Sequence, residues 1–138
     1  MSAAPLRPPA LRPAPGAALR DALEALVARE GLRAACVLSA VGSLDRAMVR
    51  LADEPTPSAF DGPFEIVALS GTLSPDGAHL HVALADANGI VIGGHLGLGS
   101  IVRTTAELVV GELQGLEFSR VPDMQTGYRE LVIRQGGR

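Results

Sequence analysis

One segment of the chain has the hydrophobic spacing of an α-helix. Over residues 17–30, AALRDALEALVARE, large apolar side chains recur at steps of three or four, at Leu19, Leu23, Leu26 and Val27. This spacing places them on one face of a helix. Gly31 follows, and glycine commonly ends a helix in the left-handed conformation. The pattern predicts one helix with a single apolar stripe, which we expect to pack on a sheet.

Most of the remaining chain has the pattern of β-strands. Runs rich in Val, Leu and Ile, separated by Gly, Pro, Asp and Asn, predict seven strands at residues 32–42, 44–52, 64–73, 79–86, 90–96, 104–113 and 128–135. A turn near Gly42 and Ser43 would make the first two an antiparallel pair. Residues 52–63 and 118–127 have loop composition. One helix, about seven strands and no internal repeat predict an α+β fold with a mostly antiparallel sheet.

Composition narrows the class of protein further. Of 138 residues, 47% are hydrophobic and 3% are aromatic, so the core must consist of aliphatic side chains. Residues 1–10, rich in proline, predict a flexible Pro/Arg-rich arm, and residues 11–138 a single domain. The formal net charge of −3 argues against the basic surface that nucleic-acid binders normally carry.

Cysteine content and hydropathy bear on the cellular compartment. The single cysteine, Cys36, excludes an internal disulfide framework. No run approaches the roughly 18 apolar residues of a membrane span. We therefore expect a cytoplasmic protein with no membrane partner.

All three histidines of the chain lie within residues 79–96, HLHVALADANGIVIGGHL. His79 and His81 are two residues apart in a predicted strand, so their side chains point to the same face. The next residues on that face are alanines, which leave room for an ion or a ligand. The third histidine, His95, follows a predicted turn.

The position of His95 depends on the length of this turn. A two-residue turn at 88–89 would place His95 opposite Val82, pointing into the core. A three-residue loop at 87–89 would place it opposite His81, on the histidine face. Aspartate at the first turn position and glycine at the fourth favour the longer loop. A bulge at the two glycines before His95 could also redirect it.

Three neutral imidazoles suit a divalent transition metal, namely zinc, nickel, copper or iron, with one coordination position left open. A structural zinc site would need a fourth protein ligand, and the chain has no second cysteine to supply one. One interpretation of the three histidines is therefore a metal site, with zinc as the preferred ion. The alternative is that the histidines are ordinary exposed polar residues on a sheet.

Few other residues of the chain are candidates for a chemical role. Glu107 shares a predicted strand face with Arg103. It is a candidate acceptor for an imidazole N–H, or a general base near a metal-bound water; the alternative is a surface ion pair with Arg103. Arg120, Asp123 and Tyr128, near the C-terminus, are candidates for lining a cleft between subunits. No Ser-His-Asp order, phosphate loop or dinucleotide fingerprint is present, so catalytic residues stay unassigned.

From Leu11 to about Ile133 the chain resembles the PPC domain, named for its occurrence in plants and prokaryotes. The stretches that carry the resemblance are LRPAPGAALRDALEAL, AACVLSAVGSLDRAMVRL, GPFEIVALSGTLSPDGAHLHVALADANGIVIGGHL and VRTTAELVVGEL. The resemblance implies an antiparallel α+β domain that assembles as a homotrimer. Prokaryotic members are stand-alone domains labelled as DNA-binding proteins. Some resemble metal proteins, with histidines that match His79, His81 and His95.

The chain departs from the plant members in two respects. It lacks the Arg-Gly-Arg-Pro core of the AT-hook, which in plant members binds the minor groove of AT-rich DNA. Their partner-contact motif, Gly-Arg-Phe-Glu-Ile-Leu, corresponds to residues 62–67, where Pro63 replaces the arginine. Phe64 and Glu65 are therefore candidates for contacts with other regulatory proteins.

Three functions follow as hypotheses. The first is a trimeric, zinc-binding PPC protein with a DNA-binding or regulatory role. The second is a metal-dependent enzyme, such as a hydrolase that uses a metal-bound water. The third is a small-ligand-binding protein with no DNA role. The trimer has physical support, because the aliphatic strands at 64–73 and 104–113 offer more apolar surface than one helix can cover.

Overall fold

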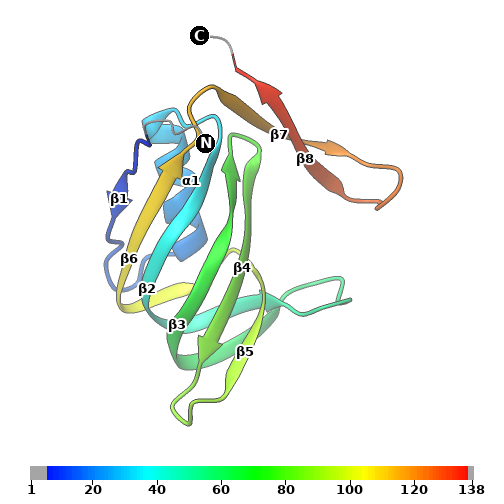
Figure 1. The fold of residues 1–138 in the computed structure, drawn as a ribbon. Helices are drawn as coiled ribbons and strands as arrows, with labels where there is room; N and C mark the ends of the chain where they lie inside the picture. Colours follow the sequence, from blue (N-terminus) through cyan, green and yellow to red (C-terminus); the bar gives the residue numbers. More distant parts are fainter. Residues whose placement is uncertain (1–5, 137–138) are drawn as a thin grey trace, which may run out of the picture.

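The computed structural model describes residues 6–136. These residues form two antiparallel sheets and one helix (Figure 1). The elements are β1 (Ala10–Leu11), α1 (Leu19–Glu30), β2 (Ala35–Arg50), β3 (Ser58–Ser74), β4 (Gly77–Ala85), β5 (Val91–Leu96), β6 (Ile101–Glu112), β7 (Leu116–Pro122) and β8 (Arg129–Gln135). The larger sheet has the strand order β1-β6-β2-β3-β4-β5, and β7 pairs with β8. The predicted α+β class with a mostly antiparallel sheet is confirmed.

Helix α1 forms where the spacing predicts it. Its apolar stripe is buried, and its C-cap, Gly31, has the left-handed φ of 63°. The helix contacts β3, β4 and β6, so it covers the inner face of the larger sheet. Between the helix and this face lies a core of aliphatic side chains, including Leu23, Leu44, Leu73 and Leu108.

Strand β2 is continuous where the sequence predicts a chain reversal, so the predicted turn at Gly42 and Ser43 is wrong. Its pairing with β6 shifts register on both sides of Leu44, and such irregularities bend a strand without ending it. A Cβ atom at Gly42 would lie 2.2 Å from the carbonyl oxygen of Thr105. The glycine therefore permits a close approach of β6.

Two predicted loops are partly strand. Residues 52–63 were expected to be irregular, but β3 begins at Ser58 and pairs with the end of β2. Residues 118–127 were also expected to be a loop, but β7 runs through Pro122 and pairs with β8. In both cases hydrogen bonds to the neighbouring strand of a hairpin outweigh the local loop composition, because pairing overrides weak strand propensity.

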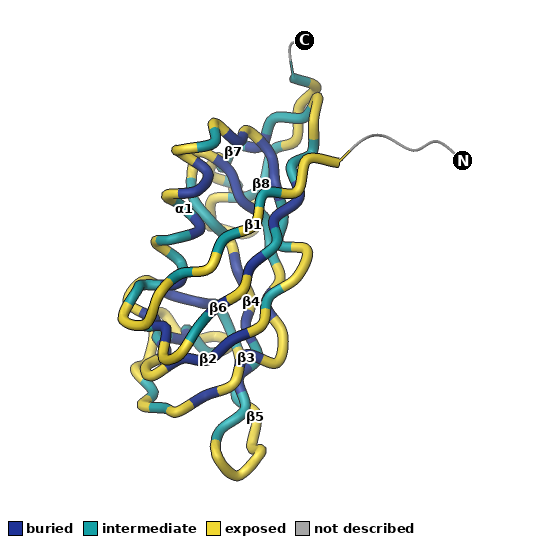
Figure 2. The backbone as a smooth tube through the Cα atoms, turned by 90° about the vertical axis from the view of Figure 1, so that its left-hand side faces the viewer, coloured by how far each residue is buried: buried dark blue, intermediate teal, exposed yellow. Residues whose placement is uncertain are grey.

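The larger sheet curls so that β5 has two neighbours. It pairs with β4 along its length and with the end of β2, where Arg50 lies opposite His95. The loop that joins β4 to β5 is exposed at one end of the molecule (Figure 2).

The first described residues run beside β6. The backbone of Arg7 bridges to Glu112, and its guanidinium lies 2.6 Å from the carboxylate of Glu30. Among residues 6–136, no helix combines the length and the apolar character needed to cross a bilayer.

Candidate metal centre

The β4–β5 hairpin carries all three histidines on the face that points away from the core. His79 and His81 are exposed on β4, and His95 is half-buried on β5. The side chains that alternate with the β4 histidines are buried in the core, namely Leu80, Val82 and Leu84. The alternation of polar and apolar residues in the sequence therefore predicts the correct face of β4 for His79 and His81.

A three-residue loop joins the two strands, as the turn residues predict. The N–H of Asp86 donates to the carbonyl of Ile90 at 2.9 Å, and Gly89 has a φ of 79°. The Asp86 carboxylate accepts hydrogen bonds from the N–H groups of Asn88, at 2.8 Å, and Ile90, at 2.9 Å. This loop places His95 directly opposite His81.

The two glycines before His95 allow close backbone packing and do not form a bulge. The register between β4 and β5 is unbroken through Gly93 and Gly94. A Cβ atom at Gly94 would lie 2.5 Å from the carbonyl oxygen of Arg50, and one at Gly93 would lie 2.6 Å from that of Val82. Side chains here would push β5 away from both neighbouring strands.

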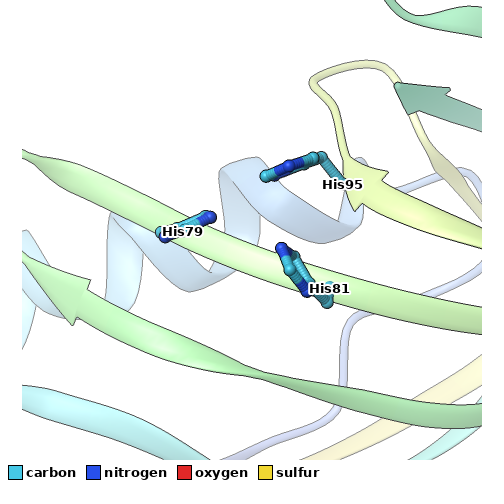
Figure 3. Close-up of side chains that lie close together, drawn as sticks. All are labelled: His79, His81 and His95. Atoms are coloured by element: carbon cyan, nitrogen blue, oxygen red, sulfur yellow. The ribbon is translucent and has the colours of Figure 1, made fainter. Parts of the chain in front are cut away.

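The three imidazoles converge on a common point (Figure 3). One ring nitrogen from each lies within 4.8 Å of those of the other two. The ring of His81 is 4.5 Å from that of His95, centroid to centroid, at an interplanar angle of 80°. His79 and His95 lie 5.2 Å apart with nearly parallel rings.

This arrangement fits a first-row transition metal. Zinc–nitrogen bonds of about 2.0–2.1 Å hold the ligand nitrogens of a tetrahedral site about 3.4 Å apart. Small rotations of the imidazoles would therefore close the group around an ion. Three nitrogen donors without a fourth protein ligand are typical of zinc sites that leave a position open.

Burial and neighbouring positive charges lower the pKa of two of the imidazoles. Burial, Arg120, His81 and Arg50 lower the pKa of His79 below 6.5, and Glu130 partly opposes them. Burial, followed by Arg50, lowers the pKa of His95. Because a metal binds only the neutral imidazole, this shift favours ligation at neutral pH.

A solvent-open cavity of about 480 Å³ adjoins His79 and His95. Four arginines from different elements line it, namely Arg20, Arg50, Arg120 and Arg129. Of the three residues that the sequence suggested for a subunit cleft, Arg120 and Tyr128 line this cavity and Asp123 does not, but the sequence did not connect them with the histidines. No local pattern could have done so, because the β2–β5 pairing and the placement of the β7–β8 hairpin depend on long-range contacts.

Other candidate residues lie elsewhere. Glu107 is on β6, which β2 and β3 separate from β4 in the sheet order. The structure therefore does not bring it to the histidines of this chain. Its suggested partner, Arg103, instead contacts Asp45 at 2.8 Å. Phe64 is a core residue with 6% exposure, and Glu65 is exposed.

Solved structures share this fold along nearly the whole chain. A hypothetical protein from Salmonella enterica is 42% identical, with a TM-score of 0.92 and 97% of each chain covered. A protein from Archaeoglobus fulgidus that is named as metal-containing is 29% identical, with a TM-score of 0.77 and coverage of 91% and 93%.

Relatives are also found within longer proteins. The bifunctional protein GlmU of a Synechococcus strain is 49% identical over 125 residues, 91% of this chain, but the chain spans only a fifth of its length. An AT-hook motif nuclear-localized protein of Arabidopsis thaliana is 36% identical over 92 residues, 60% of the chain and 26% of that protein. The family description that matches residues 1–114 is the Plants and Prokaryotes Conserved (PCC) domain, the PPC domain of the sequence analysis. The chain therefore belongs to the PCC domain family.

Proposed function

We propose that this domain binds one divalent transition metal ion, with zinc preferred, through His79, His81 and His95. The observation that carries the proposal is the convergence of three imidazole nitrogens from two strands within 4.8 Å. The metal-containing relative from Archaeoglobus fulgidus supports it. A bound zinc ion would act as a Lewis acid toward a ligand at its open position. The chain's own contribution is to hold three neutral imidazoles on a fixed hairpin.

Metal content tests this proposal directly. Purified wild-type protein dialysed against limiting zinc should retain about one equivalent per chain, and His81→Ala should lose most of it. Cys36→Ser is the matched control, because it removes the single thiol of the chain without touching the histidines. Equal zinc content in wild type and His81→Ala would exclude the site.

We further propose that the domain assembles as a homotrimer through the outer face of β2 and β3. Three large apolar side chains there are about half exposed or more, namely Leu38, Val41 and Val67. Exposed apolar area gathered in this way usually marks an interface. The proposed number of three subunits comes from the resemblance to PPC domains.

DNA binding is a second candidate, favoured by the similarity to the Arabidopsis AT-hook protein. A net charge of −3 restricts any contact to local basic groups, such as the arginines beside the histidines. The affinity of such a contact falls steeply with salt. Fluorescence anisotropy of labelled AT-rich duplex DNA between 50 and 200 mM salt tests this candidate. An affinity independent of salt, or no binding at low salt, would contradict it.

A further inference from the structure

We propose that the ligand of the metal site is a small organic anion, and that its carboxylate or phosphate group contacts both the metal and the guanidinium groups of Arg50 and Arg120. This inference rests on the metal site proposed above. It extends that proposal by naming the chemical class of the ligand and the residues that select it.

Both arginines are held beside the histidines by cross-strand pairing. Arg50 is the direct β2 partner of His95, so the two side chains point to the same face. The guanidinium of Arg120 donates to the hydroxyl of Thr72 at 2.9 Å, and Thr72 is the direct β3 partner of His79. Each arginine is therefore held beside one of the histidines, and both arginines line the cavity that adjoins His79 and His95.

Within the part of the chain that the structure describes, the guanidinium groups of these arginines are not paired with carboxylates. Among residues 6–136, Arg50, Arg120 and Arg129 form no salt bridge. Their guanidinium groups donate to neutral oxygens, which are the carbonyl of Glu54, the hydroxyl of Thr72 and the carbonyl of Arg120. A guanidinium has five N–H donors in a planar fork, and this fork matches carboxylate and phosphate groups. Donors therefore remain for a ligand.

The acidic residues of the cavity balance only part of the positive charge of its arginines. Asp53, Asp76 and Glu130 line it together with the four arginines. Asp76 accepts the backbone N–H of Arg120 at 2.8 Å, and Glu130 accepts the hydroxyl of Thr126 at 3.0 Å. Neither hydrogen bond involves a guanidinium group, and the three carboxylates balance at most three of the four arginine charges.

Electrostatics explains why an anion belongs between these groups. A divalent ion held by three neutral histidines keeps its full charge, and guanidinium groups nearby repel it. An oxyanion placed between the metal and the arginines attracts both, and these attractions offset the repulsion between them. The cavity of about 480 Å³ falls within the usual range for small-molecule sites. It has room for an organic group attached to the anion.

Tyrosine fluorescence supplies a local readout. Tyr128 is the single tyrosine of the chain, which has no tryptophan, and it lines the cavity. Zinc-loaded protein is titrated with glycerol 3-phosphate in one arm and with succinate in the other. We expect saturable binding in at least one arm, and the arm that responds distinguishes a phosphate from a carboxylate ligand.

Variants separate the arginines from the metal. Arg50→Gln and Arg120→Gln should each raise the Kd of the anion at least tenfold while retaining zinc. Arg103→Gln, an exposed arginine paired with Asp45 outside the cavity, should bind the anion as wild type does. Without anion, Arg120→Gln should bind zinc at least as tightly as wild type, because a repelling charge is gone. A merely structural role for Arg120 would instead weaken zinc binding.

Two results would overturn the inference. One is zinc-loaded wild type that binds neither anion, and the other is unchanged anion affinity in both arginine variants. The zinc content of the same samples tests metal binding independently of anion binding. Wild type that retains no zinc would overturn the proposed metal function itself.

Discussion

At the scale of single residues, the histidine cluster depends on what surrounds each imidazole. Desolvation and two nearby arginines disfavour the protonated form of the His79 ring. Gly94 acts through the backbone, because the absence of a side chain there lets β5 lie against Arg50 of β2. His79 affects metal binding through its protonation, and Gly94 affects it because a side chain there would push β5 away from β2.

Stability of the metal-free protein should fall on acidification below neutral pH. The folded pKa values of His79 and His95 are lower than 6.5, so the unfolded chain binds protons more readily. Stability is then fully present above about pH 6.5 and declines as pH falls through the lower folded values. Urea midpoints between pH 7.5 and 5, with EDTA present, measure this trend. His79→Gln should show a shallower decline, and an equal slope would contradict the assignment.

Gly94→Ala should loosen the contact between β5 and β2. The new Cβ would lie 2.5 Å from the Arg50 carbonyl oxygen, and overpacking of this kind costs about 1–3 kcal/mol. Urea unfolding measures the loss, and zinc affinity should fall with it because His95 is the next residue. Gly136→Ala is the control, since its nearest neighbour is the flexible side chain of Glu117. Equal stabilities of the two variants would contradict this explanation.

At the scale of elements, the β4–β5 hairpin is the unit that makes the site. Its loop sets the register, and the register decides whether His95 points to the core or to His81. The sequence contains this information, because Asp86 and Gly89 together favour a three-residue loop. The β7–β8 hairpin shows the opposite case. Its first strand reads as a loop, yet it supplies Arg120 to the cavity.

Asp86→Ala should weaken both the hairpin and metal binding. The substitution removes the acceptor for two backbone N–H groups, those of Asn88 and Ile90, at a cost of about 1–2 kcal/mol. Isothermal titration with zinc should show weaker binding, since His95 is less firmly held opposite His81. Asp86→Asn keeps an acceptor oxygen and should restore most of the affinity. Wild-type zinc binding by Asp86→Ala would show that the loop does not position the site.

At the scale of the whole molecule, one helix covers the inner face of the larger sheet. The outer face keeps exposed apolar side chains such as Val41, which is 59% exposed, and Val67, which is 58% exposed. A large exposed apolar patch is uncommon on a monomer. Self-association would cover this surface.

Sedimentation equilibrium should give a mass of about three times 14.2 kDa for the wild-type protein at micromolar concentration. Val41→Glu would place a charge in the proposed interface, and burying it unpaired is unfavourable, so the variant should sediment as a monomer. Val91→Glu, at an exposed position near the tip of the β4–β5 hairpin, is the matched control and should stay trimeric. A monomeric wild type would exclude the trimer.

The sequence by itself determined what depends on near neighbours along the chain. Helix α1, its end at Gly31, the alternation of His79 and His81 and the β4–β5 loop all follow from local periodicity and turn chemistry. Tertiary structure alone decided the continuity of β2 through Gly42, the strand character of β7 and the approach of Arg50 and Arg120 to the histidines. These features arise from pairing and packing between separate segments of the chain, some of them far apart in sequence, and such pairing leaves no periodic mark on either segment by itself.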